Sequence, residues 1–270
     1  MAVPPLRALV DAGFDVALVV TRPDKRRGRG SALTPSPVKA AASELGLPVT
    51  SAVADALKVG ADLGVVVAFG RIIATDVLAE LPMVNLHFSR LPRWRGAAPV
   101  ERALLAGDET TGVDVMAVEA GLDTGGIYAE SVVPIGPETT ADELRTALVE
   151  EGSRLLVETL RAGLGAPAPQ VGEPTYAEKI RPGELQLDWN RPAVELHRLI
   201  RLGGAWTTFR GKRLKLWRAR LTPTGEGVAV PTGDGTLELT EVQPEGKGRM
   251  PATAWANGAR PVPGELGLAP

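Results

Sequence analysis

Short apolar runs and amphipathic stretches follow one another through the first part of the chain. Three apolar runs have the length of buried β-strands, and they lie at Val16–Val20, Leu63–Phe69 and Val84–Phe88. Stretches with helical spacing precede or separate these runs, at Pro4–Asp11, Pro37–Leu45 and Asp76–Leu81. Strands that alternate with helices predict an α/β fold whose sheet is mostly parallel and is covered by helices.

The same alternation continues to about Leu160. A helix is predicted at Val100–Leu105, and two strands are predicted at Val113–Val118 and Ile127–Val133, with a glycine-rich turn between the strands. Thr140 and Glu143 have the spacing of a capping box, which predicts the start of a long helix. We therefore place the first, Rossmann-like domain at residues 1–165.

The composition changes after this helix. Residues 163–174 are rich in Gly, Ala and Pro, which is typical of a surface linker, and we assign residues 166–182 to it. Beyond the linker, a predicted helix near Ala193–Arg201 is followed by several short strands punctuated by glycines. Short strands separated by turns predict a small C-terminal β-barrel of the OB-like type at residues 183–270.

The chain begins with a helix, whereas an α/β sheet of the nucleotide-binding type normally begins with a strand. We therefore expect the first strand of the sheet to be missing from this chain. Such a loss exposes the edges of the neighbouring strands and removes buried apolar area.

Composition and charge exclude several classes of protein. The chain has no cysteine, so disulfides, thiolate nucleophiles and cysteine-ligated zinc are excluded. Its two histidines, His87 and His197, are far apart, and we predict no metal site. No apolar run approaches the roughly 20 residues that a membrane-spanning helix needs, and no signal peptide is recognisable. We expect a cytoplasmic monomer without a membrane partner.

The segment from Val84 to Phe88 carries a polar pair. The two-residue period of a strand puts Asn85 and His87 on one side, and both lie near the carboxyl end, where open α/β sheets bind ligands. Asp123 lies in a glycine-rich turn that leaves the next strand. A lone histidine is more often a satisfied structural residue, and an aspartate in such a turn is by default a turn former.

Together, an amide, an imidazole and a carboxylate suit acyl transfer to an amine. Asn85 can stabilise an oxyanion, His87 can donate to that oxyanion or take the amine proton, and Asp123 can orient His87. The sequence does not choose between the two roles of His87. A serine-hydrolase elbow and a phosphate-binding loop are both absent from the chain.

Two segments are basic. The first is a glycine-containing loop that carries Arg22, Lys25, Arg26, Arg27 and Arg29 against a single acidic residue. The second, Arg210–Arg220, alternates basic and apolar residues and places Arg213 and Lys215 on the same face as Trp217, next to Lys212. Basic runs are usually solvated surfaces, but basic, aromatic strand faces also bind nucleic-acid backbones, and we favour that function here.

Several separate motifs make the chain similar to one family. The segment Asn85–Pro99, with the sequence NLHFSRLPRWRGAAP, resembles the signature of methionyl-tRNA formyltransferases, and Gly121–Gly125 (GLDTG) resembles their second motif. Further matches follow the family's order, in Arg22–Gly30, Pro35–Lys39 and Pro174–Ala177. A series of matches in the right order is far more specific than a single short motif.

The resemblance implies a formyl transfer from 10-formyltetrahydrofolate to the amino group of methionyl initiator tRNA. By the same resemblance, Asn85, His87 and Asp123 are the catalytic residues, and Ser89, Arg90, Leu91 and Pro92 form a folate-binding turn. The basic loop is then expected to approach the acceptor end of the tRNA, and the C-terminal barrel is expected to help hold it. Arg90 departs from the family, which more often has leucine there.

Two other functions share these features. A sugar-amine formyltransferase would use the same carrier and the same three residues, but the segment Arg93–Ala98 and the basic barrel favour tRNA. A truncated, inactive tRNA-binding protein would keep its affinity for RNA without turnover. Folate binding separates this last function from the other two.

Overall fold

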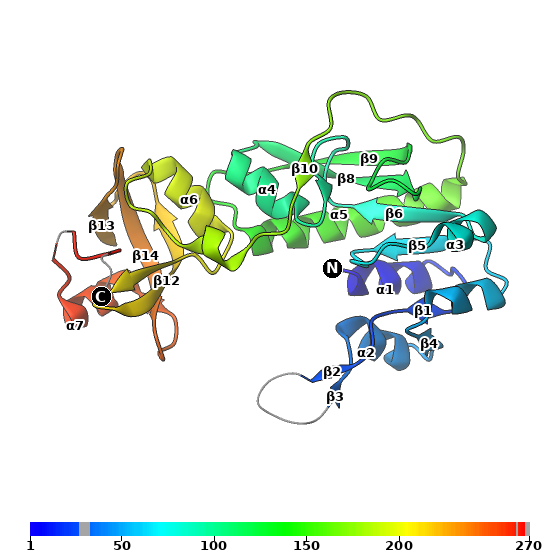
Figure 1. The fold of residues 1–270 in the computed structure, drawn as a ribbon, viewed down its shortest axis with the longest axis horizontal. Coiled ribbons are helices and arrows are strands. Elements are labelled where there is room, and N and C mark those ends of the chain that lie inside the picture. Colours follow the sequence, from blue (N-terminus) through cyan, green and yellow to red (C-terminus); the bar gives the residue numbers. More distant parts are fainter. Residues whose placement is uncertain (27–32, 263, 268–270) are drawn as a thin grey trace. The chain divides into compact units, whose positions relative to one another are not determined.

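The computed structural model describes residues 1–26, 33–262 and 264–267, and they form two compact units (Figure 1). The first unit comprises Met1–Pro99, Thr110–Pro134 and Arg145–Ala177. The second comprises Val100–Glu109, Ile135–Leu144 and Glu178–Pro270. Helices α4 (Pro99–Ala106) and α5 (Ala141–Ala162) contribute residues to both. Arg27 and Arg29 of the basic loop lie outside the described residues.

The first unit follows the predicted alternation of strands and helices. Its helical elements are α1 (Val3–Asp11), α2 (Pro37–Glu44), the short 3₁₀ helix η1 (Val53–Lys58), α3 (Thr75–Glu80) and most of α5. Its strands are β1 (Val19–Val20), β2 (Lys25–Arg26), β3 (Leu33–Thr34), β4 (Val49–Thr50), β5 (Gly64–Val67), β6 (Met83–His87), β7 (Arg95–Gly96), β8 (Thr110–Ala117), β9 (Ile127–Pro134) and β10 (Tyr176–Ala177). The predicted helices and the predicted strands after residue 60 are confirmed within a few residues.

The main sheet has the order β5-β6-β8-β9. Strands β5 and β6 are parallel, whereas β6, β8 and β9 are antiparallel to their neighbours. The prediction of a mostly parallel sheet is therefore wrong for β8 and β9. Residues 118–126, which join these two strands, contain no helix, and a parallel connection needs a longer crossover.

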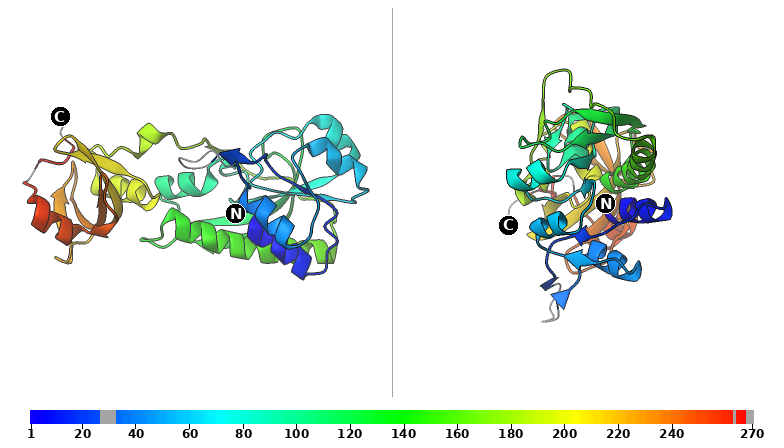
Figure 2. Two further views of the ribbon diagram at one scale, coloured as in Figure 1. Left: turned by 90° about the horizontal axis from the view of Figure 1, so that it is seen from below. Right: turned by 90° about the vertical axis from the view of Figure 1, so that its right-hand side faces the viewer.

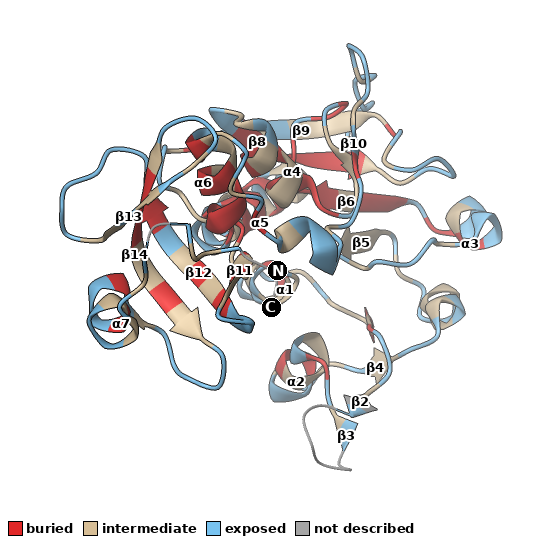
Figure 3. Ribbon diagram, turned by 60° about the vertical axis from the view of Figure 1, so that its left-hand side comes forward, coloured by how far each residue is buried: buried red, intermediate tan, exposed pale blue. Residues whose placement is uncertain are grey.

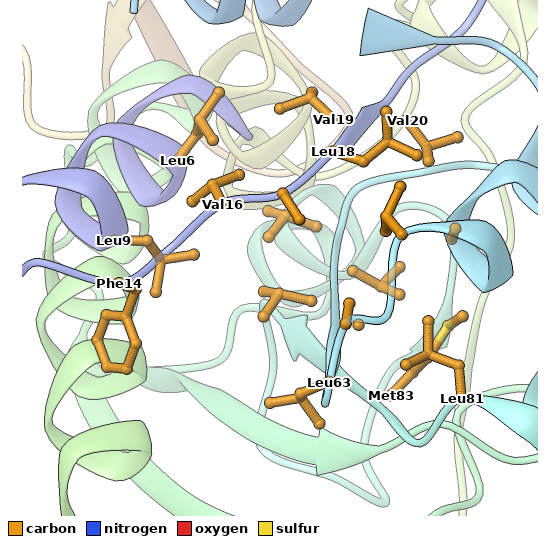
Figure 4. Close-up of a pocket in the computed structure, with 18 of the residues that line it drawn as sticks. Leu6, Leu9, Phe14, Val16, Leu18, Val19, Val20, Leu63, Leu81 and Met83 are labelled. Atoms are coloured by element: carbon orange, nitrogen blue, oxygen red, sulfur yellow. The ribbon is translucent and has the colours of Figure 1, made fainter. Parts of the chain in front are cut away.

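The sheet is interrupted between β1 and β5. Among the described residues, β1 pairs only with β4, and β5 pairs only with β6. An apolar cavity of about 610 Å³ lies between the two pairs and is lined by consecutive residues 14–20 on one side and 61–67 on the other (Figure 4). Strand β1 is short, and Val16–Leu18 before it pair with no strand among the described residues.

Helix α5 covers the apolar face of the main sheet. A β-carbon added at Gly152 would lie 2.9 Å from Cγ1 of Val113 and 3.2 Å from Cδ2 of Leu86, so helix and sheet approach closely here. Helix α1 lies beside α5, and Arg161 donates a hydrogen bond to the carbonyl oxygen of Ala12 (Figure 2). The predicted capping box is present, because the amide of Thr140 donates to Glu143 and the amide of Glu143 donates to the Thr140 hydroxyl.

The second unit is an antiparallel sheet that curls into a half-barrel, where the sequence predicted a barrel. Its strands, in the order β11-β12-β14-β13, are β11 (Trp206–Phe209), β12 (Lys212–Arg220), β14 (Thr236–Pro244) and β13 (Val228–Pro231), and β15 (Met250–Pro251) pairs with β14. Besides most of α4 and the start of α5, this unit contains η2 (Pro182–Leu185), α6 (Ala193–Arg201) and α7 (Ala252–Ala259).

Helix α6 buries one face in this unit (Figure 3). Leu196 and Ile200 are fully buried, and His197 lies between them in the sequence with Nε2 within 3.1 Å of the Ala219 carbonyl oxygen and of Glu138. His197 is therefore a satisfied structural residue. None of the helices in the described parts of the chain combines the length and apolar character needed to cross a membrane.

Two glycines in helices test the close approach of α5 to the sheet. Alanine raises helix stability by about 1 kcal/mol over glycine, but overpacking costs about 1–3 kcal/mol. We expect Gly152→Ala to lower the free energy of unfolding, measured with urea. Gly258→Ala is the control, because no atom lies within 4 Å of an added β-carbon there, and it should leave stability unchanged or raise it. A stabilised Gly152→Ala variant would contradict the tight packing.

Candidate active site

The polar pair on β6 lies on the side of the sheet that α5 does not cover. Along β6 the side chains alternate, so that Leu86 faces α5 while Asn85 and His87 face the loops that follow β6 and β8. The side chain of Asn85 is half-buried, and it makes no hydrogen bond to any other described residue. Its amide is therefore open to a ligand on this face.

The ring of His87 is held between a carbonyl group and a carboxylate. Its Nε2 lies 3.0 Å from the carbonyl oxygen of Trp94, and its Nδ1 lies 3.7 Å from Oδ2 of Asp123. A carbonyl oxygen only accepts, so Nε2 carries the hydrogen, and in the neutral ring Nδ1 is the unprotonated nitrogen. The basic nitrogen of His87 thus faces Asp123.

Burial decides the charge of His87. The residue is 5% exposed, and burial lowers the pKa of His87 below its ordinary value. The charge of Asp123 and the hydrogen bond to Trp94 act in the opposite direction and offset part of this shift. His87 is therefore neutral at neutral pH, next to a carboxylate that stabilises its protonated form.

Asp123 is fixed by its backbone and by one strong hydrogen bond. Its φ of 50° lies in the left-handed region, which a short polar residue in a turn tolerates. Its Oδ2 accepts a hydrogen bond of 2.7 Å from the amide of Gly96. Gly125 allows the turn to pass close to β8, because an added β-carbon would lie 2.0 Å from the carbonyl oxygen of Ala117.

The predicted folate-binding turn leads from β6 into the segment that contacts His87. Ser89, Leu91 and Pro92 are buried, and the hydroxyl of Ser89 donates to the carbonyl oxygen of Arg93 at 2.7 Å. Arg90 is exposed, with Nη2 3.8 Å from Oε2 of Glu130. The turn therefore offers a ligand its backbone and the Arg90 side chain.

The segment assigned to the linker contacts this site. The Gln170 amide donates to the carbonyl oxygens of Asp123 and Gly125, both at 2.8 Å, and its oxygen accepts from Arg95. Strand β10 pairs with β7, and Thr175 accepts a hydrogen bond from the Trp94 amide. The segment Ala168–Ala177, which lies within the predicted linker, is therefore mostly exposed and is also hydrogen-bonded to the segments that carry His87 and Asp123.

Sequence analysis also missed Asp114. It lies on β8 directly opposite His87 and is fully buried, and its Oδ2 accepts a hydrogen bond of 2.7 Å from the amide of Leu91. A charged residue inside an otherwise apolar strand was the available signal. No cluster of three or more potential metal ligands is found within the described ranges.

The basic loop is a hairpin in its described part. Lys25 pairs with Thr34 through the backbone, and Arg22 and Arg26 are exposed. The single acidic residue of the loop, Asp24, forms an ion pair with Lys39 at 2.7 Å. Because Lys39 neutralises Asp24, the arginines of the loop are left without this acidic partner.

The half-barrel has a face on which arginines lie over indole rings. Arg213 lies 4.1 Å from the ring centre of Trp206, and Arg249 lies 3.4 Å from that of Trp217, with Lys215 at 5.8 Å from the same ring. Lys212 is exposed but falls in register with the buried Leu214, on the other side of β12. Sequence analysis missed Arg249, because it belongs to a loop outside β12.

Comparisons with known proteins define the class of this chain. Residues 6–160 match the formyl transferase family, and residues 179–260 match the formyl transferase C-terminal domain. A solved N-formyltransferase of Helicobacter canadensis, in complex with folinic acid and dTDP-3-aminofucose, has the same fold with a TM-score of 0.67 at 19% identity, over 88% of this chain and 95% of that one. The fold and the family matches are those of a formyl transferase.

Sequence relatives narrow this class. The methionyl-tRNA formyltransferase of Symbiobacterium thermophilum is 44% identical over 286 residues, covering 94% of this chain and 88% of the relative. That of Paenarthrobacter aurescens is 44% identical over 287 residues, covering 96% of this chain and 94% of the relative. The chain belongs to the methionyl-tRNA formyltransferase family.

The contacts of Gln170 make a testable contribution to the site. Gln170→Ala removes both hydrogen bonds to the turn that carries Asp123, and we expect turnover to fall about tenfold, since a displacement of about 1 Å at a catalytic group is costly. Steady-state kinetics measure this effect. Val171→Ala is the matched control, because that neighbouring side chain is 86% exposed, and it should leave turnover unchanged. Equal kinetics for both variants would remove Gln170 from the site.

Proposed function

We propose that this chain transfers a formyl group from 10-formyltetrahydrofolate to the amino group of methionyl initiator tRNA. The observation that supports this function best is a neutral His87, next to Asp123, on the same strand face as the open Asn85 amide. Family membership supplies the choice of substrates. The location proposed for the reaction is the cytoplasm.

In the proposed reaction, the methionine amine attacks the formyl carbon directly. A C–N bond to the amine forms, the carbonyl oxygen becomes an oxyanion, and the bond from the formyl carbon to N10 of the carrier then breaks. The amine loses one proton and N10 gains one, so tetrahydrofolate leaves. No covalent enzyme intermediate is needed.

Each of the three residues has one part in this mechanism. Asn85 donates a hydrogen bond from its amide to the oxyanion. His87 takes the amine proton on Nδ1, because the ring is neutral and Trp94 already occupies Nε2. Asp123 stabilises the imidazolium that results. The Trp94 carbonyl group, rather than Asp123, fixes the tautomer.

The carrier is proposed to bind along the turn Ser89–Pro92. The buried side chains of this turn fix its backbone, and Arg90 is exposed beside it. A guanidinium group can pair with the carboxylates of a folate tail. This ion pair would add to the contacts that the backbone of the turn makes. Arg90 is therefore proposed to contribute affinity where the family more often has leucine.

The proposal predicts transfer to methionyl initiator tRNA and little transfer to amino-sugar nucleotides, with the same radiolabelled formyl donor. We expect Asn85→Ala, His87→Ala and Asp123→Asn each to lower turnover by about 100-fold or more. Transfer to sugar amines alone would favour the sugar enzyme. Salt-sensitive RNA binding without folate binding or turnover would favour an inactive RNA-binding protein.

The same variants give a pH test of the role of His87. The basic form of His87 is required, so activity should fall as pH falls through its pKa, which lies below the ordinary 6.5. Because Asp123 raises that pKa, Asp123→Asn should move the acidic limb of kcat/KM to still lower pH. A limb that moves to higher pH would contradict the assignment of His87 as base.

The basic surfaces are proposed to contact the tRNA backbone. They comprise the basic loop, with Arg22, Lys25, Arg26, Arg27 and Arg29, and the half-barrel residues Lys212, Arg213 and Lys215. The side chains of Arg213 and Lys215 share their face with Trp217 and Arg249. Phosphate contacts release counterions, so the affinity for tRNA should fall steeply as salt rises.

Replacing two charges tests this face. The double variant Arg213→Ala, Lys215→Ala should weaken tRNA binding and lower the slope of log affinity against log salt by about one to two. Filter binding at several salt concentrations measures both quantities. Arg191→Ala, which removes a charge paired with Glu195, is the matched control and should keep the slope. An unchanged slope in the double variant would exclude this face.

A further inference from the structure

Asp114 is a buried carboxyl group that the proposed chemistry does not use. It belongs to β8, its side chain is fully buried, and it lies directly opposite His87 on β6 and Glu130 on β9. A carboxyl group in such a place is expensive to bury unless it has a purpose or a complete set of partners. Its set of partners is incomplete, because Oδ1 makes no hydrogen bond among the described residues.

The other carboxyl oxygen of Asp114 accepts one hydrogen bond from the described residues. Oδ2 accepts a hydrogen bond of 2.7 Å from the amide of Leu91, in the middle of the turn Ser89–Pro92. Leu91 is itself buried, so no water can readily replace this acceptor. The position of the turn relative to β6 and β8 therefore depends on Asp114.

The charges around Asp114 come from three segments. The pKa of Asp114 is raised to about 7. Burial is the largest cause and Glu130 also raises the pKa, whereas the hydrogen bond from the Leu91 amide and the charge of Arg90 act to lower it. His87 faces it across β6, and Arg90 also lies 3.8 Å from Glu130. The carboxyl group thus changes its charge within the working range of most enzymes, while it holds the turn.

We propose that Asp114 is a positioning residue, which holds the amide of Leu91 and so sets the affinity of the turn Ser89–Pro92 for the formyl donor. This inference rests on the proposed function of that turn. The ionised carboxylate makes a shorter and stronger hydrogen bond to the amide than the neutral group does. Affinity for the donor therefore rises as pH increases through the titration of Asp114, and it is lower in the protonated form.

Three variants test this inference in the full chain. Asp114→Leu removes the acceptor, and we expect KM for 10-formyltetrahydrofolate to rise about tenfold while kcat at saturation stays within about threefold. Asp114→Asn keeps an acceptor oxygen without a charge, so its KM should match that of the wild type at pH 6.5 and should no longer fall between pH 6.5 and 8.5. Thr111→Val is the control, and KM should not change. Thr111 lies on the opposite face of the same strand, and its buried hydroxyl makes no hydrogen bond to the described residues.

The stability of the asparagine variant checks that Asp114 titrates in the folded protein. Because the pKa of Asp114 is raised in the folded protein, its protonation stabilises the fold. This stabilisation is complete at a pH below the ordinary pKa of an aspartate, near 4, and it is lost as pH rises through about 7. The Tm of the wild type should therefore fall relative to that of Asp114→Asn between pH 5 and 8. Parallel Tm curves would overturn the titration that the pH dependence requires.

Direct binding of folinic acid, measured by calorimetry, reads donor affinity without turnover. If the wild type binds folinic acid but transfers nothing to tRNA, the proposed function fails while the role of Asp114 is still measured. A Leu variant with lower kcat, unchanged KM and unchanged folinic acid affinity would show a structural role alone and overturn the inference. So would identical pH profiles of KM for the wild type and Asp114→Asn.

Discussion

The antiparallel pairing of β6 with β8 is the interaction on which the first unit depends. It sets Leu86 against Val115 on the side of α5, and it sets His87 against Asp114 on the opposite side. Side chains alternate with a period of two, so a shift of one residue would exchange the apolar and polar faces. The close contact of Gly152 with Leu86 and Val113 makes any such shift costly, because only one register leaves a dry surface for the helix.

The geometry around His87 then comes mainly from backbone groups. The Trp94 carbonyl group fixes the tautomer of His87, and the Gly96 amide fixes Asp123. Both belong to the segment after β6, which Thr175 and the pairing of β7 with β10 hold in place. Backbone groups in a paired loop have little freedom, so the distances at the site require no large rearrangement of side chains.

The half-barrel uses a different physical device. Stacking on Trp206 and Trp217 limits the rotamers of Arg213 and Arg249, while the N–H groups at the edges of each guanidinium group stay available. These side chains are therefore partly ordered in the free protein, so that binding a ligand costs less conformational entropy. The same stacking places side chains from β11, β12 and the loop at Arg249 on one surface. Of these segments, only β12 is recognisable as basic from the sequence.

Local patterns determined most of the elements, the capping of α5 and the placement of Asn85 and His87 on one face, because side-chain periodicity and capping act over a few residues. The motifs around Asn85 and Asp123 also determined the family. Tertiary structure alone decided the direction of β8 and β9, the cavity beside β1, and the entry of Gln170 and Thr175 into the site. It also decided the role of Asp114, since a hydrogen bond across 23 residues and the low dielectric around a buried carboxyl group depend on which segments pack together, and no local pattern encodes that.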